Sequence, residues 1–206
     1  MENYLIKGLL IGLVFGVPAG SIGALTIERT LAGGFRAGLF TGAGSSVADV
    51  LYACVGVFGL TVISDFLLSH QKLIGLVGGM LSILLGVLIF RKKGGKPTLR
   101  RDAGIRSYAL CFSSAFAVAI TNPATILSFF LAFASFGVAE KLSPPDGTLL
   151  IIGILTGTLC WWAGLAGIVS AFRAKVTDAI YQRLNWILGC LMAVFGVIVL
   201  IRAWTT

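Results

Sequence analysis

Long apolar runs separated by short polar stretches dominate the chain. A helix needs about 20 apolar residues to cross a bilayer, and six runs come close to or exceed this length. They cover about residues 5–27, 37–62, 73–90, 108–139, 148–170 and 185–203. This pattern predicts an all-α polytopic membrane protein with six transmembrane helices.

Two of the six runs are interrupted at a proline. GVPAGS, at 16–21, falls in the first run, and TNPAT, at 121–125, falls in the fourth, which is too long for one straight span. Proline removes a backbone donor and frees a carbonyl one turn earlier, and in lipid such groups must find other partners. We therefore expect helices 1 and 4 to be broken at Pro18 and Pro123, although a simple packing kink would also explain each proline.

The third and sixth runs resemble each other. HQKLIGLVGG, at 70–79, aligns with YQRLNWILGC, at 181–190, and the two proline breaks correspond in the same order. Chance similarity between apolar stretches is the alternative explanation. The interpretation favoured here is two three-helix repeats, 1–90 and 108–206, joined by a basic cytoplasmic linker, 91–107. Because three is odd, the second repeat is inverted, an arrangement common in secondary transporters, whose sites lie at the midplane.

Composition and charge support a membrane location. Hydrophobic residues make up 57% of the chain and charged residues only 12%, whereas about a quarter of the residues of a soluble domain are charged. The net charge of +8 does not indicate nucleic-acid binding, because the basic residues gather at the ends of apolar runs. Twelve Lys and Arg residues fall in three alternate loops and four on the other side. The positive-inside rule then places both termini outside the cytoplasm.

Asp49 is the one acidic residue near the middle of an apolar run. A carboxylate there costs about 2.5–3.5 kcal/mol on insertion scales, and such residues commonly mark an ion or proton path. Asp49 is therefore the candidate for proton coupling, able to hold a proton or meet a cationic group, with purely structural pairing as the alternative. Ser46 lies one turn earlier, on a face with small residues, so this face is expected to line a cavity.

Small and polar residues at the two breaks and beside Asp49 complete the expected substrate site. The candidates are Pro18, Gly20, Ser21, Ser46, Asp49, Thr121, Asn122, Pro123 and Thr125. Glu28 and Arg29 end the first run and form a candidate gate, although a solvated helix end is the plainer interpretation. One histidine and four scattered cysteines indicate neither a metal site nor a cofactor.

The stretch VPAGSIGALTIERTLAGGFRAGLFTGAGSSVADVLYACVGVFGL, followed by TNPATILSFFLAFASFG, resembles the LysE/RhtB family of bacterial amino-acid exporters. The resemblance implies a multi-pass protein of the bacterial inner membrane that exports amino acids or related small metabolites by using the proton gradient. It carries over to Pro18 with Gly20, to Asp49 and to Asn122-Pro123. Many members have a second proline where this chain has Ser21, and lysine where it has Ala124.

Other functions are less well supported by the residues. An enzyme needs a nucleophile–base pair or a metal cluster, and no such set is visible, so we expect no enzyme. A divalent-cation or other small-solute exporter or channel is the alternative, but hard cations need several oxygen ligands and only Asp49 is within a span. The expected partners are a small-molecule substrate and the lipid bilayer. Glycine-rich helix faces would permit a homodimer.

Overall fold

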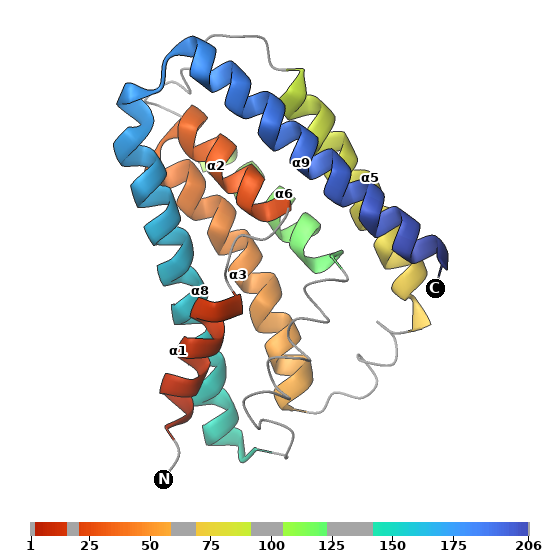
Figure 1. Ribbon diagram of the computed structural model, residues 1–206. Coiled ribbons are helices and arrows are strands. Elements are labelled where there is room, and N and C mark those ends of the chain that lie inside the picture. Colours follow the sequence, from red (N-terminus) through yellow and green to blue (C-terminus); the bar gives the residue numbers. More distant parts are fainter. Residues whose placement is uncertain (1–2, 16–20, 59–68, 92–104, 123–141, 206) are drawn as a thin grey trace.

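The computed structural model describes residues 3–15, 21–58, 69–91, 105–122 and 142–205. This part of the chain forms seven α-helices and one short 3-10 helix, without strands. The helices are α1 (Tyr4–Phe15), α2 (Ser21–Gly33), α3 (Phe35–Val57), α5 (Gln71–Phe90), α6 (Ile105–Ile120), α8 (Pro144–Phe172) and α9 (Asp178–Thr205), and the 3-10 helix is η1 (Arg173–Lys175). Figure 1 shows the helices packed side by side in one bundle.

The helices have the length and surface of membrane-spanning elements. Four are long and apolar enough to cross a bilayer: Phe35–Val57, Lys72–Phe90, Pro144–Lys175 and Asp178–Trp204. Large apolar side chains such as Leu84 on α5 and Leu191 on α9 point outward and are exposed. A monomer in water rarely exposes so much contiguous apolar surface, so the chain is a multi-pass membrane protein.

Helix ends lie beside both predicted breaks. α1 ends at Phe15 and α2 begins at Ser21, and the intervening residues 16–20, which include Pro18, lie outside the described residues. α6 ends at Ile120, and residues 123–141 also lie outside them. The first predicted span is therefore represented by two helices, and the fourth by its first half.

Three helices differ in extent from the apolar runs. α8 begins at Pro144, because the side chain of Ser143 caps the helix by accepting a bond from the backbone nitrogen of Asp146 and proline suits the first helical turn. α9 begins at Asp178, seven residues before the sixth run. The first turns of α8 and α9 are polar. Hydropathy therefore does not count these turns in the apolar runs, although they are helical. α3 ends at Val57, short of the predicted 62, and 59–62 lie outside the described residues.

Glycines bring α1 and α8 into backbone contact. The two helices run in the same direction, with Gly8 against Leu150 and Gly12 against Ile154. A Cβ atom on Gly12 would lie 2.5 Å from the carbonyl oxygen of Ile154, so only glycine fits. Small residues allow this kind of close helix packing within a bilayer.

α5 and α9 form a second tight pair, which is antiparallel. Gly79 lies against Gly196, and Gly86 lies against Gly189. A Cβ on Gly86 would lie 2.8 Å from the carbonyl oxygen of Gly189, and one on Gly196 would lie 2.7 Å from that of Gly79. Figure 1 shows this pair along one side of the bundle.

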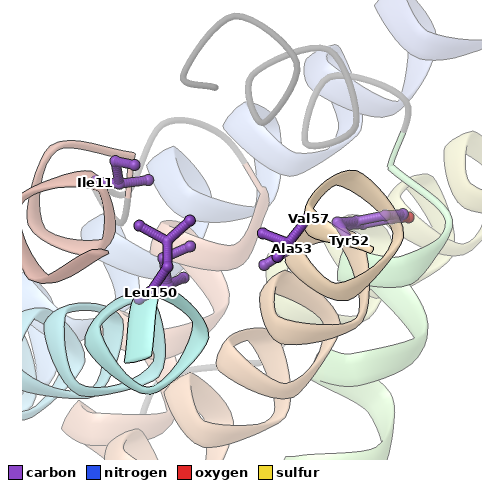
Figure 2. Close-up of a cluster of buried hydrophobic side chains, with 6 residues drawn as sticks. Ile11, Tyr52, Ala53, Val57 and Leu150 are labelled. Atoms are coloured by element: carbon purple, nitrogen blue, oxygen red, sulfur yellow. The ribbon is translucent and has the colours of Figure 1, made fainter. Parts of the chain in front are cut away.

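α3 packs between the α1–α8 pair and α6. Figure 2 shows Ile11 of α1, Leu150 of α8 and Ala53 of α3 in one buried cluster, with Tyr52 extending from α3 away from the first two residues. α2 joins α3 through a single residue, Gly34, whose φ of 79° is in the region that favours glycine.

Candidate functional site

Four helices meet near the two predicted breaks. Ile22 near the start of α2, Ala48 in the middle of α3, Val118 and Ala119 near the end of α6, and Trp162 in the middle of α8 form one buried cluster. These residues are sequence neighbours of the predicted site residues on α2, α3 and α6. The fold thus brings those three segments together, and it adds the middle of α8.

Asp49 is buried within this region. Its side chain is on α3 and is 7% exposed, and Ser46, one turn earlier, is completely buried. The hydroxyl of Ser46 has no hydrogen-bond partner among the described residues. Since buried polar groups are nearly always hydrogen-bonded, an unused hydroxyl one turn from a buried carboxyl is a candidate ligand-binding group.

Tyr52 links α3 to the end of α6. Its hydroxyl donates a hydrogen bond of 2.5 Å to the carbonyl oxygen of Ile120, the last residue of α6. Carbonyls at a helix end lack helical partners, so the bond satisfies a group beside the predicted break. Tyr52 is not among the predicted site residues, although it is a polar residue about one turn after Asp49 in the sequence.

Thr121 and Asn122 occupy the turn that ends α6. The Asn122 backbone nitrogen donates to the carbonyl of Ala119, and Asn122 is buried. The Thr121 hydroxyl donates to the carbonyl of Ala117 within its own helix, and Gly78 of α5 contacts Thr121. Of the two, Asn122 has the more completely buried side chain.

Three further buried polar groups lie on α2 and α8. Ser21 begins α2, and its hydroxyl has no partner among the described residues. The same is true of the indole nitrogens of Trp161 and Trp162. All three are donors, and the start of α2 carries the positive end of the helix dipole, so this region favours an anionic group such as a carboxylate.

The predicted gate residues are inside the bundle. Glu28 is 2% exposed, so the plainer interpretation, a solvated helix end, is wrong. Arg29 donates hydrogen bonds of 2.7 Å to the carbonyl of Cys111 and to the hydroxyl of Ser114, both on α6. The hydroxyl of Tyr181 on α9 lies 3.5 Å from the Glu28 carboxylate. The two neighbouring side chains therefore reach different helices, and gating by them stays a prediction.

Arg173 secures the end of α2. Its guanidinium donates bonds of 2.7 and 2.8 Å to the carbonyls of Leu31 and Ala32, in the last turn of that helix. A cation at a helix C-terminus also interacts favourably with the helix dipole. Arg173 belongs to one of the three basic loops of the sequence, and hydropathy gives no information about its partners on α2.

Four of the predicted site residues cannot be placed by the structure. Pro18, Gly20, Pro123 and Thr125 lie outside the described residues. Ser21, Ser46, Asp49 and Asn122 are all buried on the segments that meet in the cluster.

Comparison with known proteins supports a transporter. The family model described as LysE type translocator matches residues 13–203. The chain is 28% identical to the Bacillus subtilis protein named "Putative amino acid efflux protein YcgF", over 94% of this chain and 93% of that protein.

Two further relatives are of similar length. Identity is 27% to the Pseudomonas aeruginosa "Chemotactic transduction protein ChpE", over 93% of each chain. It is 26% to the Escherichia coli "Uncharacterized membrane protein YahN", over 94% of this chain and 86% of that protein. No solved structure matches the chain. A match over nearly the full length, together with the apolar helices and the buried polar groups, means that the chain belongs to the LysE-type translocator family.

Proposed function

We propose that the protein is a secondary active transporter that exports amino acids or related small metabolites across the bacterial inner membrane by proton antiport. The observation that carries this proposal is the buried Asp49 with the unused Ser46 hydroxyl beside it, on a helix that packs between α1–α8 and α6. The family and the relative named for amino acid efflux support the class of function.

The proposed site binds a zwitterion. Asp49 accepts the ammonium group or a proton, and donors on α2, α3 and α8 face the carboxylate. Those donors are the hydroxyls of Ser21 and Ser46 and the indole nitrogens of Trp161 and Trp162. A proton and the ammonium group of the substrate compete for the Asp49 carboxylate. Because only one of them can be bound at a time, the inward movement of protons is coupled to the outward movement of the substrate. Moving one charge through 100 mV supplies about 2.3 kcal/mol, which supports a roughly fiftyfold concentration ratio.

An inverted repeat accounts for the helix pairing. If 1–90 and 108–206 are related by a twofold axis in the membrane plane, the α1–α8 contact corresponds to the α6–α3 contact. Both pairs are parallel and have close glycine contacts. Gly12 lies against Ile154 in the α1–α8 pair, and Gly44 lies against Phe112 in the α3–α6 pair. α5 and α9 then pair with each other across the axis, as their antiparallel glycines support. The basic loops, including 91–107, face the cytoplasm in this proposal.

Efflux measurements with an Asp49→Asn variant test the proposal. Cells are preloaded with a panel of labelled amino acids, and loss of label is followed with and without an uncoupler. We expect expression-dependent efflux that the uncoupler abolishes. Asp49→Asn should lose this energised efflux but keep membrane insertion, whereas Asp178→Asn, at the exposed start of α9, should behave as wild type.

The outcomes separate the mechanism from the function. Efflux by Asp49→Asn that remains sensitive to the uncoupler would exclude Asp49 as the coupling residue. Wild-type efflux that proceeds at the same rate with and without the uncoupler would indicate a channel or an exchanger. No efflux of any compound in the panel would refute the amino-acid assignment.

A further inference from the structure

A second buried polar cluster lies between α2 and α9, on different helices from Asp49. It consists of Glu28 on α2 and of Tyr181 and Asn185 on α9, with exposed fractions of 2%, 1% and 0%. We call these three residues the α2–α9 polar cluster. Figure 1 shows α2 and α9 next to each other, and Ala24 of α2 and Leu188 of α9 belong to one buried apolar cluster.

Asn185 has unused hydrogen-bonding capacity. Its side chain lies close enough to interact with the Tyr181 phenol, one helical turn away, yet neither its Nδ2 nor its Oδ1 atom makes a hydrogen bond of ordinary length and angle with the described residues. A fully buried amide with neither group paired is costly and rare in a folded protein. The Tyr181–Glu28 hydrogen bond, at 3.5 Å, is also at the long limit of such bonds. A ligand that enters beside the Asn185 amide would supply the hydrogen bonds that this amide lacks.

The surrounding charges define the ligand further. Arg29 and Arg173 act electrostatically on this cluster, but the hydrogen bonds described above direct their guanidinium groups to neutral acceptors on α6 and at the end of α2. Glu28 suits an ammonium group, while the Asn185 amide and the Tyr181 hydroxyl can donate to a carboxylate. The two guanidinium groups favour that carboxylate and repel a basic side chain.

An apolar groove adjoins the cluster. A groove of about 290 Å³, open on the outer face of the bundle where Leu191 and Val194 are exposed, is lined by Gly23, Ala24 and Ile27 of α2 and by Leu188, Leu191 and Val194 of α9, among others. Ala24 is one turn before Glu28, and Leu188 is one turn after Asn185, so the groove begins where the polar cluster ends. Its size suits an aliphatic or aromatic side chain, and an apolar pocket with a few polar groups at one end is the usual form of a small-molecule site.

We propose that the α2–α9 polar cluster and its groove form a second binding site, for an α-amino acid with an apolar side chain. Glu28 and the Oδ1 atom of Asn185 accept from the ammonium group, and Tyr181 and the Nδ2 atom of Asn185 donate to the carboxylate. The side chain lies in the groove. This inference rests on the proposed amino-acid export, and it assigns the site to the end of the bundle that carries the basic loops, where export would begin if those loops are cytoplasmic.

Leucine binding to the full-length protein in nanodiscs tests the site. Wild type should bind labelled leucine at two classes of site. Asn185→Leu and Glu28→Gln should weaken one class by about tenfold or more, the loss expected for removing one hydrogen-bonding group, and leave the other class intact. Asp49→Asn should affect the complementary class.

Gln182→Leu is the matched control, because it makes the same kind of replacement on α9 at a half-buried position. Asn185→Leu should also raise the unfolding temperature, since it removes an unpaired buried amide, and the control should not. Weaker binding in a more stable variant excludes misfolding as the cause.

Three results would overturn the inference in distinguishable ways. One class of leucine site in wild type, lost in Asp49→Asn and unchanged in Asn185→Leu, refutes the second site but keeps the proposed function. Absence of binding for leucine, valine, methionine and phenylalanine in wild type refutes a site for apolar amino acids, whereas the efflux panel described above decides the proposed export separately. If Glu28→Gln and Asn185→Leu reduce only the retention of phosphatidylethanolamine, measured by mass spectrometry, the groove holds a lipid and the inference is wrong.

Discussion

Arg29 should stabilise the fold by fastening α2 to α6. Its guanidinium donates 2.7 Å hydrogen bonds to the Cys111 carbonyl and to the Ser114 hydroxyl, and Thr41 on α3 lies 3.5 Å away. The Ser114 hydroxyl can accept this bond because it donates its own proton to the carbonyl of Leu110. Arg29→Met keeps much of the side-chain length and removes all the donors.

The expected loss of stability follows from these bonds. A hydrogen bond to a charged group contributes about 1.5–3 kcal/mol, so two short bonds would give about 3–6 kcal/mol if solvent did not compete. Because the Arg29 side chain is only half-buried, we expect a decrease of about 2–4 kcal/mol in the free energy of unfolding. Ser114→Ala removes one acceptor and should cost about 1–2 kcal/mol.

A double-mutant cycle measures the interaction itself. Reversible unfolding in mixed micelles, titrated with SDS and followed by tryptophan fluorescence, gives the free energies for wild type, Arg29→Met, Ser114→Ala and the double variant. We expect a coupling energy of about 1–2 kcal/mol. Ser113→Ala, next to Ser114 but exposed, is the control and should show none. A coupling energy near zero for Arg29 with Ser114 would refute this account of how α2 is held.

Three further predictions concern stability. Tyr52→Phe leaves the Ile120 carbonyl without its partner and should reduce the free energy of unfolding by about 1–3 kcal/mol. An unchanged free energy of unfolding would contradict a stabilising role for this hydrogen bond. Arg173→Met removes two bonds to the last turn of α2 and should cost about 1–2 kcal/mol; faster proteolysis of α2 would provide a second measurement. Gly12→Ala places a Cβ against the Ile154 carbonyl and should cost about 1–3 kcal/mol. Gly164→Ala, whose Cβ would meet nothing within 4 Å, should be neutral or stabilising, and equal effects would contradict the packing explanation.

Four of the predicted spans and the buried acid on α3 could be predicted from the sequence because both are local features. Hydropathy averaged over about 20 residues locates a span, and Asp49 is recognisable as the acidic residue near the middle of the second apolar run. The start of α9 was missed because Asp178 and Gln182 interrupt an apolar run, although they do not interrupt helical hydrogen bonding. A helix boundary depends on backbone bonds and capping, and hydropathy reports only the side chains.

Contacts between distant segments could not be predicted in this way. Tyr52 meets Ile120 across 68 positions, and Tyr181 meets Glu28 across 153. The apolar run stops at Glu28, so hydropathy places this residue at the end of a span, yet Tyr181 of α9 lies against its carboxylate. No periodicity within a single helix reports which other helix packs against it.

The single-residue connection at Gly34 limits how α2 and α3 can move. The Cα atoms of Gly33 and Phe35 are two steps of about 3.8 Å apart along the chain, so they can separate by about 7 Å at most, only slightly more than the roughly 5.4 Å rise of one helical turn. Neither helix can therefore slide past the other by a full turn without unwinding. A lengthwise shift of either helix is thus transmitted to the other through Gly34, which connects the helix that carries Glu28 to the helix that carries Asp49.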